Sequence, residues 1–301
     1  MKHHAVIGYF NRHTDREEVE QVYGEAFLRW VYGHPLGRAA LHTVVKRGGF
    51  SRLYGWLMDS DCSRDLIGPF IARYGLDPGD FADPPDRFGS FNDFFYRRLR
   101  EGVRPLDPDP DAAVFPADGR HLAVPEVAAM DGFFVKGQRF DLATLLGDQQ
   151  LAERFSRGPL ILSRLCPVDY HRFHFPVCGV PAAPRVLPGS LYSVSPLALR
   201  QRLAYLWENK RVLTEMRTER FGLVLVVEVG ATNVGSMVQT FRPGHPVAKG
   251  AQKGYFRFGG SSVITLFEPG RLCLAPDLLR ESARSRELYA HVGSRLGTRL
   301  P

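Results

Sequence analysis

The segment Lys253-Gly254-Tyr255-Phe256-Arg257-Phe258-Gly259-Gly260-Ser261-Ser262-Val263-Ile264 places a Gly-Ser junction between two runs of strand-forming residues. Glycine tolerates strained dihedrals that expose its carbonyl group, and the hydroxyl of the following serine can reach that carbonyl. A chain can cleave itself at such a turn. Because Gly-Gly-Ser-Ser is also common in plain turns, the motif alone leaves two readings open, a strand-to-strand turn and a self-cleavage site.

Short apolar runs with Gly and Pro between them extend outward from this segment. Three of them are Leu160-Ile161-Leu162, the run 222–229 and the run 262–267. Short strands separated by turns predict a β-rich barrel or sandwich. One helix is expected to interrupt it, from about residue 196 to residue 207, and the last 25 residues are expected to form a weakly ordered or helical tail.

A stretch rich in Pro and Asp, residues 104–111, marks a boundary. We predict that residues 1–103 before it are mostly helical, with one helix start at Thr14–Glu18 and one helix end at Gly75. The sequence therefore predicts an α+β chain, with a helical N-terminal region followed by a β-rich domain over residues 104–301. The apolar stripes of the first region are explained either by a helical core or by a surface that lies in a membrane interface.

The chain of 301 residues carries a formal net charge of +7, which favours a polyanionic partner. Its arginines are scattered and no nucleic-acid motif is visible, so we expect an anionic membrane and no nucleic acid. The four cysteines form no Cys-x-x-Cys pair, which favours a reducing compartment. No apolar run reaches the roughly 18–20 residues that span a bilayer, and we expect no secretory signal peptide. These features predict a peripheral protein on the cytoplasmic face of a membrane.

Two histidines stand three residues apart in the run 166–176. His171 and His174 would lie on opposite faces of a strand but could converge in a turn or helix. They could also form half of a metal site, but no further ligands complete a familiar spacing, so we predict no metal. Asp118 lies on a Pro/Gly turn. It is either a turn residue or, with a histidine and a serine, the orienting acid of an Asp-His-Ser relay.

In combination, these motifs resemble the phosphatidylserine decarboxylases, which are pyruvoyl-dependent enzymes. The resemblance covers nearly the whole chain. Its main carriers are the run 259–262, the turn 117–119 and the segment 169–174, and lesser matches fall in the same order. Those lesser matches are 91–95, 104–107, 135–137, 145–147, 209–212 and 229–235. The chain departs from the family by having Ser262 in place of the usual Thr, and Ala251-Gln252 where a carboxylate is common.

The resemblance implies a maturation chemistry and a cofactor. Asp118 would hold His174, and His174 would take the proton from Ser261 as its hydroxyl attacks the carbonyl of Gly260. Cleavage between Gly260 and Ser261 would give a β chain, residues 1–260, and an α chain, residues 261–301, which remain associated. Ser261 would become a covalent pyruvoyl group, the working cofactor.

The resemblance also implies the reaction, the fold and the partners. The amine of phosphatidylserine would form a Schiff base with the pyruvoyl group, and loss of CO₂ would give phosphatidylethanolamine. His171 is the candidate for positioning the carboxylate or donating the proton. The catalytic domain would have the hybrid-barrel fold, residues 1–103 would associate with an anionic membrane, and a homodimer is a further expectation.

Two other functions stay open at this stage. The first is a pyruvoyl-dependent decarboxylase that acts on another amino acid or amino-acid headgroup. The second is a β-barrel binding module that never processes. The N-terminal membrane surface argues against a soluble substrate, and the presence of Asp118, His171, His174 and Ser261 together argues against a binding module.

Overall fold

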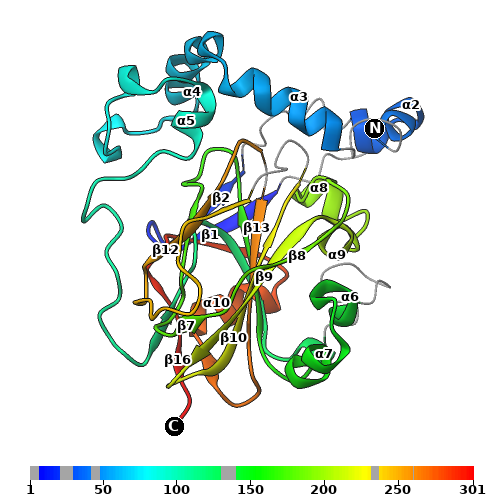
Figure 1. The fold of residues 1–301 in the computed structure, drawn as a ribbon, viewed down its shortest axis with the longest axis vertical. Coiled ribbons are helices and arrows are strands. Elements are labelled where there is room, and N and C mark those ends of the chain that lie inside the picture. Colours follow the sequence, from blue (N-terminus) through cyan, green and yellow to red (C-terminus); the bar gives the residue numbers. More distant parts are fainter. Residues whose placement is uncertain (1–6, 21–29, 42–47, 130–139, 232–236, 260) are drawn as a thin grey trace.

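The computed structural model describes residues 7–20, 30–41, 48–129, 140–231, 237–259 and 261–301 (Figure 1). Its centre is a sheet in which the strands follow the order β2-β1-β15-β4-β5-β13-β10-β9-β7, with β8 also paired to β9. The strands are β1 (Gly8–Asn11), β2 (Arg16–Val19), β4 (Gly119–Val124), β5 (Leu160–Leu165), β7 (Val180–Pro181), β8 (Arg185–Leu187), β9 (Arg211–Thr218), β10 (Gly222–Val229), β13 (Ser261–Phe267) and β15 (Glu287–Ala290). The β1–β15 pair is parallel and the other pairs are antiparallel.

Two smaller sheets flank this one. The first has the order β11 (Met237–Gln239), β12 (Gln252–Phe256), β6 (Arg172–His174). The second has the order β14 (Leu272–Leu274), β16 (Arg295–Arg299), β3 (Ala112–Val114). The prediction of a β-rich second half is therefore confirmed, and the fold is of the mixed α+β kind.

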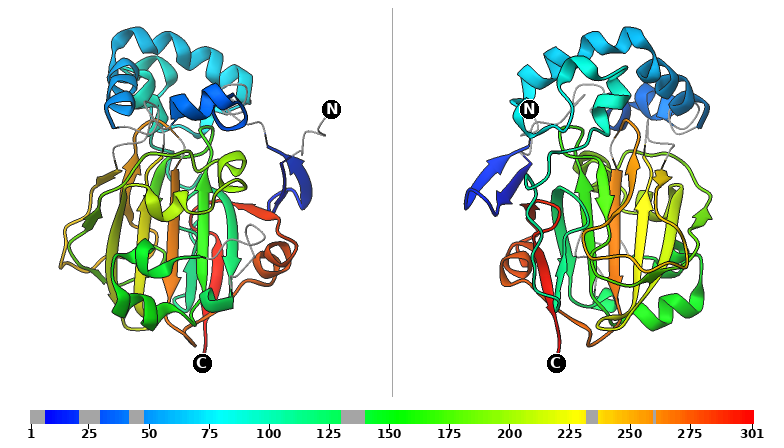
Figure 2. Two further views of the ribbon diagram at one scale, coloured as in Figure 1. Left: turned by 90° about the vertical axis from the view of Figure 1, so that its right-hand side faces the viewer. Right: turned by 60° about the vertical axis from the view of Figure 1, so that its left-hand side comes forward.

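The helices gather in two places (Figure 1). At one end of the large sheet lie α2 (Pro35–Ala40), α3 (Gly48–Asp59), α4 (Ile67–Tyr74) and α5 (Phe91–Phe95). Beside the sheet lie α6 (Leu142–Leu146), α7 (Gln149–Phe155), α8 (Pro196–Leu199), α9 (Tyr205–Glu208) and α10 (Pro276–Ala283). Figure 2 shows the first group as a layer of its own over the end of the sheet. No helix within the described ranges is long and apolar enough to cross a membrane.

Both faces of the sheet are buried along its central strands, and all the residues of β13 are buried. Side chains of a strand alternate between the two faces. Ile264 and Leu266 pack into one core cluster with the helices α6 to α9, while Val263 and Phe267 pack into clusters on the other face. A strand that is covered on both faces reads as a nearly continuous apolar run, as residues 263–267 do apart from Thr265.

The expected hybrid barrel is not what the described strands form. The large sheet is open, with β2 at one edge and β7 and β8 at the other, so it is not a closed barrel. The edge strands explain this. The sequence of β2 is Arg-Glu-Glu-Val, and β7 is two residues long and ends in Pro181, which has no N–H to donate. Charges and proline at an edge both oppose further strand pairing.

The N-terminal prediction is correct in part. Helices do occupy residues 35–40, 48–59, 67–74 and 91–95, and α4 ends at Gly75, which adopts a left-handed φ of 62°. The expected helix start at Thr14–Glu18 is wrong, because Arg16–Val19 is a strand that pairs with β1. Its acidic residues bind neighbouring strand side chains, as Glu18 does with Tyr9 at 2.7 Å.

The expected tail and the expected single helix also need correction. Residues 276–299 form α10, β15 and β16, and β15 lies inside the large sheet between β1 and β4. The region 196–207 holds two short helices, α8 and α9, instead of one. Neither outcome is visible in local periodicity, because β15 owes its place to pairing with residues more than 150 positions away.

Candidate active site

Ser261 is the first residue of β13 and lies directly opposite Leu165 of β5. Its side chain is fully buried, and its Oγ has no hydrogen-bond partner among the described residues. A buried hydroxyl that lacks a partner costs about 1–3 kcal/mol, so the fold keeps Ser261 in an unfavourable setting. The hydroxyls of Thr214, Ser262 and Thr265 are also buried without a described partner. The place of Ser261 directly after two glycines in the sequence is what makes it the candidate for chemistry.

The segment before Ser261 is held tightly up to Gly259. Phe258 is 2% exposed and packs against the rings of Phe91 and Phe95 of α5, with centroids at 5.2 and 4.8 Å. Gly259 has a φ of 133°, a conformation that L-residues with a side chain rarely adopt. Gly260, the other half of the predicted cleavage site, lies outside the described residues.

The two histidines lie on and beside β6, and each donates one ring N–H to a backbone carbonyl. His171 Nδ1 is 2.9 Å from the carbonyl oxygen of Asp169, and His174 Nδ1 is 2.9 Å from that of Gly250. A carbonyl oxygen can only accept, so in the neutral ring Nδ1 carries the proton and Nε2 has a free lone pair. Both Nε2 atoms are buried and unpartnered within the described part of the chain.

Burial keeps both histidines neutral. It lowers the pKa of His171 to about 3, against the opposing effect of the Asp169 and Gly259 backbone groups. It also lowers the pKa of His174, although the Gly250 carbonyl and the charge of Asp118 act in the other direction. The ring of Phe95 covers His171, with centroids 3.8 Å apart. Both imidazoles are therefore unprotonated at Nε2 near pH 7, and Nε2 is the atom at which each ring would take up a proton.

Asp118 lies just before β4 and is bound differently from expectation. Its carboxylate receives Arg104 Nε at 2.9 Å and Nη2 at 2.7 Å, and Oδ1 also accepts the backbone N–H of Val292 at 2.8 Å. It forms no hydrogen bond with His174, whose Nε2 is unpartnered within the described chain. Asp118 acts on His174 through its charge, which favours the protonated ring.

A small apolar cluster contains chain neighbours or strand partners of these groups. Its members are Ala117, Leu165, Phe173, Val226, Phe256 and Val263. Ala117 precedes Asp118, Phe173 lies between the two histidines, and Leu165 pairs with Ser261. Of the conformations left open for the histidine segment, residues 172–174 adopt the strand, and His171 directly precedes it. Residues separated by more than 140 positions share this core.

Sequence reasoning missed three groups around this core. Arg104 was named only as part of a boundary segment and of a lesser family match, although it holds Asp118. Lys253 and Glu228 form a fully buried ion pair at 2.8 Å, and Glu228 lies directly opposite Val263 of β13. Burial lowers the pKa of Lys253 and raises that of Glu228. A charged residue inside the apolar run 222–229 was the available signal for this pair.

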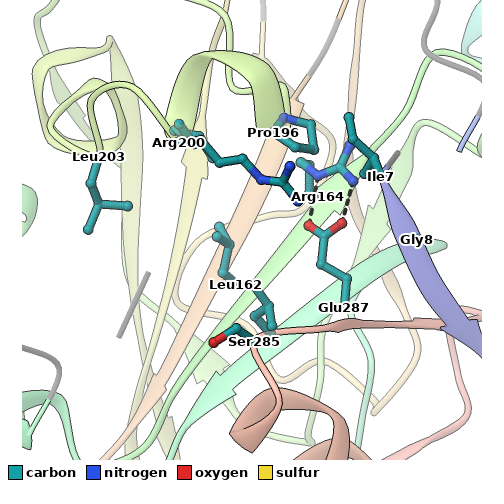
Figure 3. Close-up of a pocket in the computed structure, with 11 residues that line it drawn as sticks. Ile7, Gly8, Leu162, Arg164, Pro196, Arg200, Leu203, Ser285 and Glu287 are labelled. Carbon is teal, nitrogen blue, oxygen red and sulfur yellow. Dashed lines mark hydrogen bonds and ion pairs between the residues drawn. The ribbon is translucent and has the colours of Figure 1, made fainter. Parts of the chain in front are cut away.

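A buried charge network supports the other side of β5. Arg164 Nη2 lies 2.5 Å from both Glu20 and Glu287, and Arg120 lies 2.6 Å from Asp169. Figure 3 shows the Arg164–Glu287 pair at a cavity of about 90 Å³. Leu162 and Arg164 line that cavity, so it lies on the face of β5 opposite to Leu165. The network therefore anchors β5 behind the site.

No group of three or more His, Cys, Asp or Glu side chains in the described ranges is placed to hold a metal ion. The groups that are present suit proton transfer instead. They are a buried serine hydroxyl, two imidazoles with free Nε2 atoms, and the carboxylate of Asp118, whose charge favours the protonated form of His174. Fold and site together define an enzyme-like centre for acid–base chemistry at a serine.

Comparison with known proteins identifies the family. A model of the phosphatidylserine decarboxylase family matches residues 91–298. The phosphatidylserine decarboxylase proenzyme of Chlamydia trachomatis serovar L2 is 41% identical over 292 residues, which are 97% of each chain. Those of Desulfitobacterium hafniense strain Y51 and Clostridium kluyveri are 40% identical, over 98% and 97% of this chain and 99% of theirs. The chain belongs to the phosphatidylserine decarboxylase family.

Proposed function

We propose that this chain converts phosphatidylserine to phosphatidylethanolamine and CO₂, using a pyruvoyl group made from its own Ser261. The buried, unpartnered hydroxyl of Ser261 at the start of β13 is the observation that carries the proposal. The similarity to proenzymes over nearly the full length supports it. The name proenzyme describes those relatives, and self-processing of this chain is part of the proposal.

Processing needs a base for the serine proton. A neutral hydroxyl is a weak nucleophile. His174 accepts the proton at its free Nε2, and the charge of Asp118 stabilises the imidazolium. Oγ of Ser261 then bonds to the carbonyl carbon of Gly260, the C–N bond breaks, and the amine nitrogen takes a proton. Loss of the Cα proton of residue 261 and cleavage of its Cβ–Oγ bond then release the β chain, residues 1–260, as a carboxylate and leave a Cα=Cβ double bond, and water replaces the amine nitrogen to give the ketone and ammonia.

The residues present fit a pyruvoyl group at this position. Ser261 begins β13, which lies between β5 and β10, and its oxygen has no described partner. The ring of Phe95 packs against both His171 and Phe258. A pyruvoyl group supplies a ketone that binds an amine and acts as an electron sink for decarboxylation. His171 is neutral near pH 7 with a free Nε2. We propose that this Nε2 takes up the proton that the substrate ammonium group gives up, holds the substrate carboxylate region through that proton, and returns the proton after CO₂ leaves.

The helix α3 offers a surface for the lipid substrate. Leu53, Trp56 and Leu57 are 60%, 67% and 44% exposed, and their spacing places them on one face of the helix. An exposed apolar stripe with an aromatic residue on a protein of net charge +7 suits an anionic membrane interface. We propose that residues 1–103 bind there peripherally on the cytoplasmic face. The association of two chains into a homodimer is a further proposal.

Intact mass spectrometry of the denatured protein, together with a lipid assay, tests the function. We expect two chains split between residues 260 and 261, a pyruvoyl-blocked α chain, and formation of phosphatidylethanolamine. Ser261→Ala should remain one chain and be inactive. A cleaved and active Ser261→Ala protein would refute the proposal. A cleaved wild type that decarboxylates free amino acids but not phosphatidylserine would favour the other decarboxylase reading.

A further inference from the structure

Asn92 of α5 links the processing segment to the helical layer above it. Asn92 is 1% exposed, and both the oxygen and the nitrogen of its side-chain amide form hydrogen bonds. Oδ1 accepts the backbone N–H of Phe258 at 2.9 Å, and Nδ2 donates to Oδ1 of Asp59 at 2.8 Å. A backbone N–H requires an acceptor and a carboxylate requires a donor, so these two partners dictate the orientation of the amide.

This hydrogen bond lies two residues before the predicted cleavage site. Phe258 is followed by Gly259, with its φ of 133°, and Ser261 is already fixed in β13. The chain can present the bond between residues 260 and 261 in a defined direction only if both sides are held. Strand pairing holds the Ser261 side, and the Asn92 contact holds the other through the Phe258 backbone.

The same helix also positions a histidine. Phe95 stands three residues after Asn92, so both belong to one face of α5. Its ring lies against His171 at 3.8 Å and against Phe258 at 4.8 Å. Helix α5 therefore sets where the processing segment lies relative to the site histidines, and Asn92 is its polar contact to the backbone of that segment.

Asp59 completes the arrangement from α3. It is the last residue of that helix and also lies 3.5 Å from Arg257, the residue before Phe258. The ring of Tyr54 on the same helix stacks on Phe258 at 5.6 Å. The helix with the exposed apolar stripe thus contacts the processing segment at residues 257 and 258.

We propose that Asn92, oriented by Asp59, is a positioning residue for self-processing. It holds the Phe258 backbone so that the peptide bond between residues 260 and 261 meets the Ser261 hydroxyl. This inference rests on the self-processing proposed above. Neither Asn92 nor Asp59 touches the reacting atoms. Their effect is on geometry, so it should appear in the rate of cleavage and not in the turnover of chains already cleaved.

The test follows cleavage with time after cell-free synthesis of the full chain, by gel and intact mass. Asn92→Ala removes the acceptor, and we expect cleavage to slow about tenfold or more, as misplacement of reacting groups does. Asn92→Asp keeps an acceptor for the Phe258 N–H but places a second carboxylate beside that of Asp59. The two charges repel each other, so cleavage of this variant should also be slow. Adding Asp59→Asn to Asn92→Asp restores a donor–acceptor pair and should bring the rate back to within a few-fold of wild type.

Ser63→Ala is the matched control. The Ser63 hydroxyl accepts the backbone N–H of Phe91 at 2.8 Å, so this variant also removes a buried hydrogen bond to α5 but leaves Phe258 untouched. We expect it to cleave at close to the wild-type rate. Thermal melting of each variant with Ser261→Ala added measures folding without cleavage, and the melting temperatures of Asn92→Ala and Ser63→Ala should fall by similar amounts.

The possible results of these cleavage measurements either support the role of Asn92 or contradict it. Slow cleavage in Asn92→Ala, normal cleavage in Ser63→Ala and rescue in the double variant support the inference. Equal slowing in Asn92→Ala and Ser63→Ala, absence of rescue, or normal cleavage in Asn92→Ala would overturn it. A wild-type chain that never cleaves under the same conditions would instead contradict the proposed function.

Discussion

At the residue scale, the protonation of the two histidines decides what each can do. Both donate Nδ1–H to a carbonyl and leave Nε2 free, but their surroundings differ. The charge of Asp118 stabilises a proton on His174, whereas His171 lies under the Phe95 ring beside the backbone of Gly259. We therefore propose His174 as the base for processing and His171 for a role after cleavage.

We expect His174→Ala to leave the chain uncut, because Ser261 then has no base. His171→Ala should still cleave but lose about 10²-fold or more in decarboxylation, the usual contribution of a positioned acid–base group. Cleavage is measured by intact mass and turnover by phosphatidylethanolamine formed per cleaved chain. Wild-type cleavage in His174→Ala, or loss of cleavage in His171→Ala alone, would reverse the two roles.

Glu20 makes stability depend on acid pH. Burial raises its pKa, but the charge and hydrogen bonds of Arg164 outweigh this and lower it to about 2. The unfolded chain has an ordinary glutamate pKa of about 4.3, so the folded state favours the ionised form. The stability that Glu20 contributes is complete above that value and is lost as the pH falls toward 2.

Urea unfolding of wild type and Glu20→Gln at several pH values checks this. At neutral pH we expect the variant to be less stable by about 2–3 kcal/mol, because Arg164 loses a charged partner. The gap between the two proteins should narrow steadily from about pH 5 to pH 2. A gap that stays constant over this range would show that ionisation of Glu20 does not stabilise the fold.

At the element scale, α3 carries large apolar side chains on its exposed side as well as on its packed side. One side supports the cluster around Phe258 through Tyr54 and Met58, and another side exposes Trp56 and Leu53. A helix needs only its inner face to stay folded, so large apolar groups on the outer face indicate a partner surface. Figure 2 shows that the helical layer containing α3 lies at one end of the molecule.

The double variant Leu53→Ala/Trp56→Ala should weaken binding to anionic vesicles by roughly tenfold or more, because each side chain contributes about 1.5–3 kcal/mol when buried. Vesicle flotation measures the binding. Val186→Ala is the control, since Val186 is 57% exposed on the edge strand β8. Equal binding by wild type and the double variant would remove α3 from the membrane surface.

At the scale of the whole molecule, cleavage should not release the α chain. Residues 261–301 supply β13 between β5 and β10, β15 between β1 and β4, and β16 beside β3. These pairings are hydrogen-bonded and lie in apolar cores, so salt should not disrupt them. We expect the two chains to co-elute in size exclusion at 1 M salt and to separate only in denaturant. Separation in salt alone would contradict the observed topology.

The sequence by itself pointed to the family and named the candidate site residues. Gly259-Gly260-Ser261, Asp118 and the pair His171 and His174 are short local motifs, and each carries its chemistry in residue identity and spacing. The apolar runs also predicted the buried strands β5, β10 and β13, because a strand covered on both faces has few other compositions available.

Only the tertiary structure decided how distant segments meet. Local pattern assigned Thr14–Glu18 to a helix and the last residues to a tail, whereas pairing of β1 with β15 made both part of the large sheet. The hydrogen bond from Arg104 to Asp118 joins residues 14 positions apart. The hydrogen bond between Asn92 and the Phe258 backbone joins residues 166 positions apart. Such contacts depend on the packing of whole elements, which gives them no periodicity or spacing that a sequence pattern could reveal.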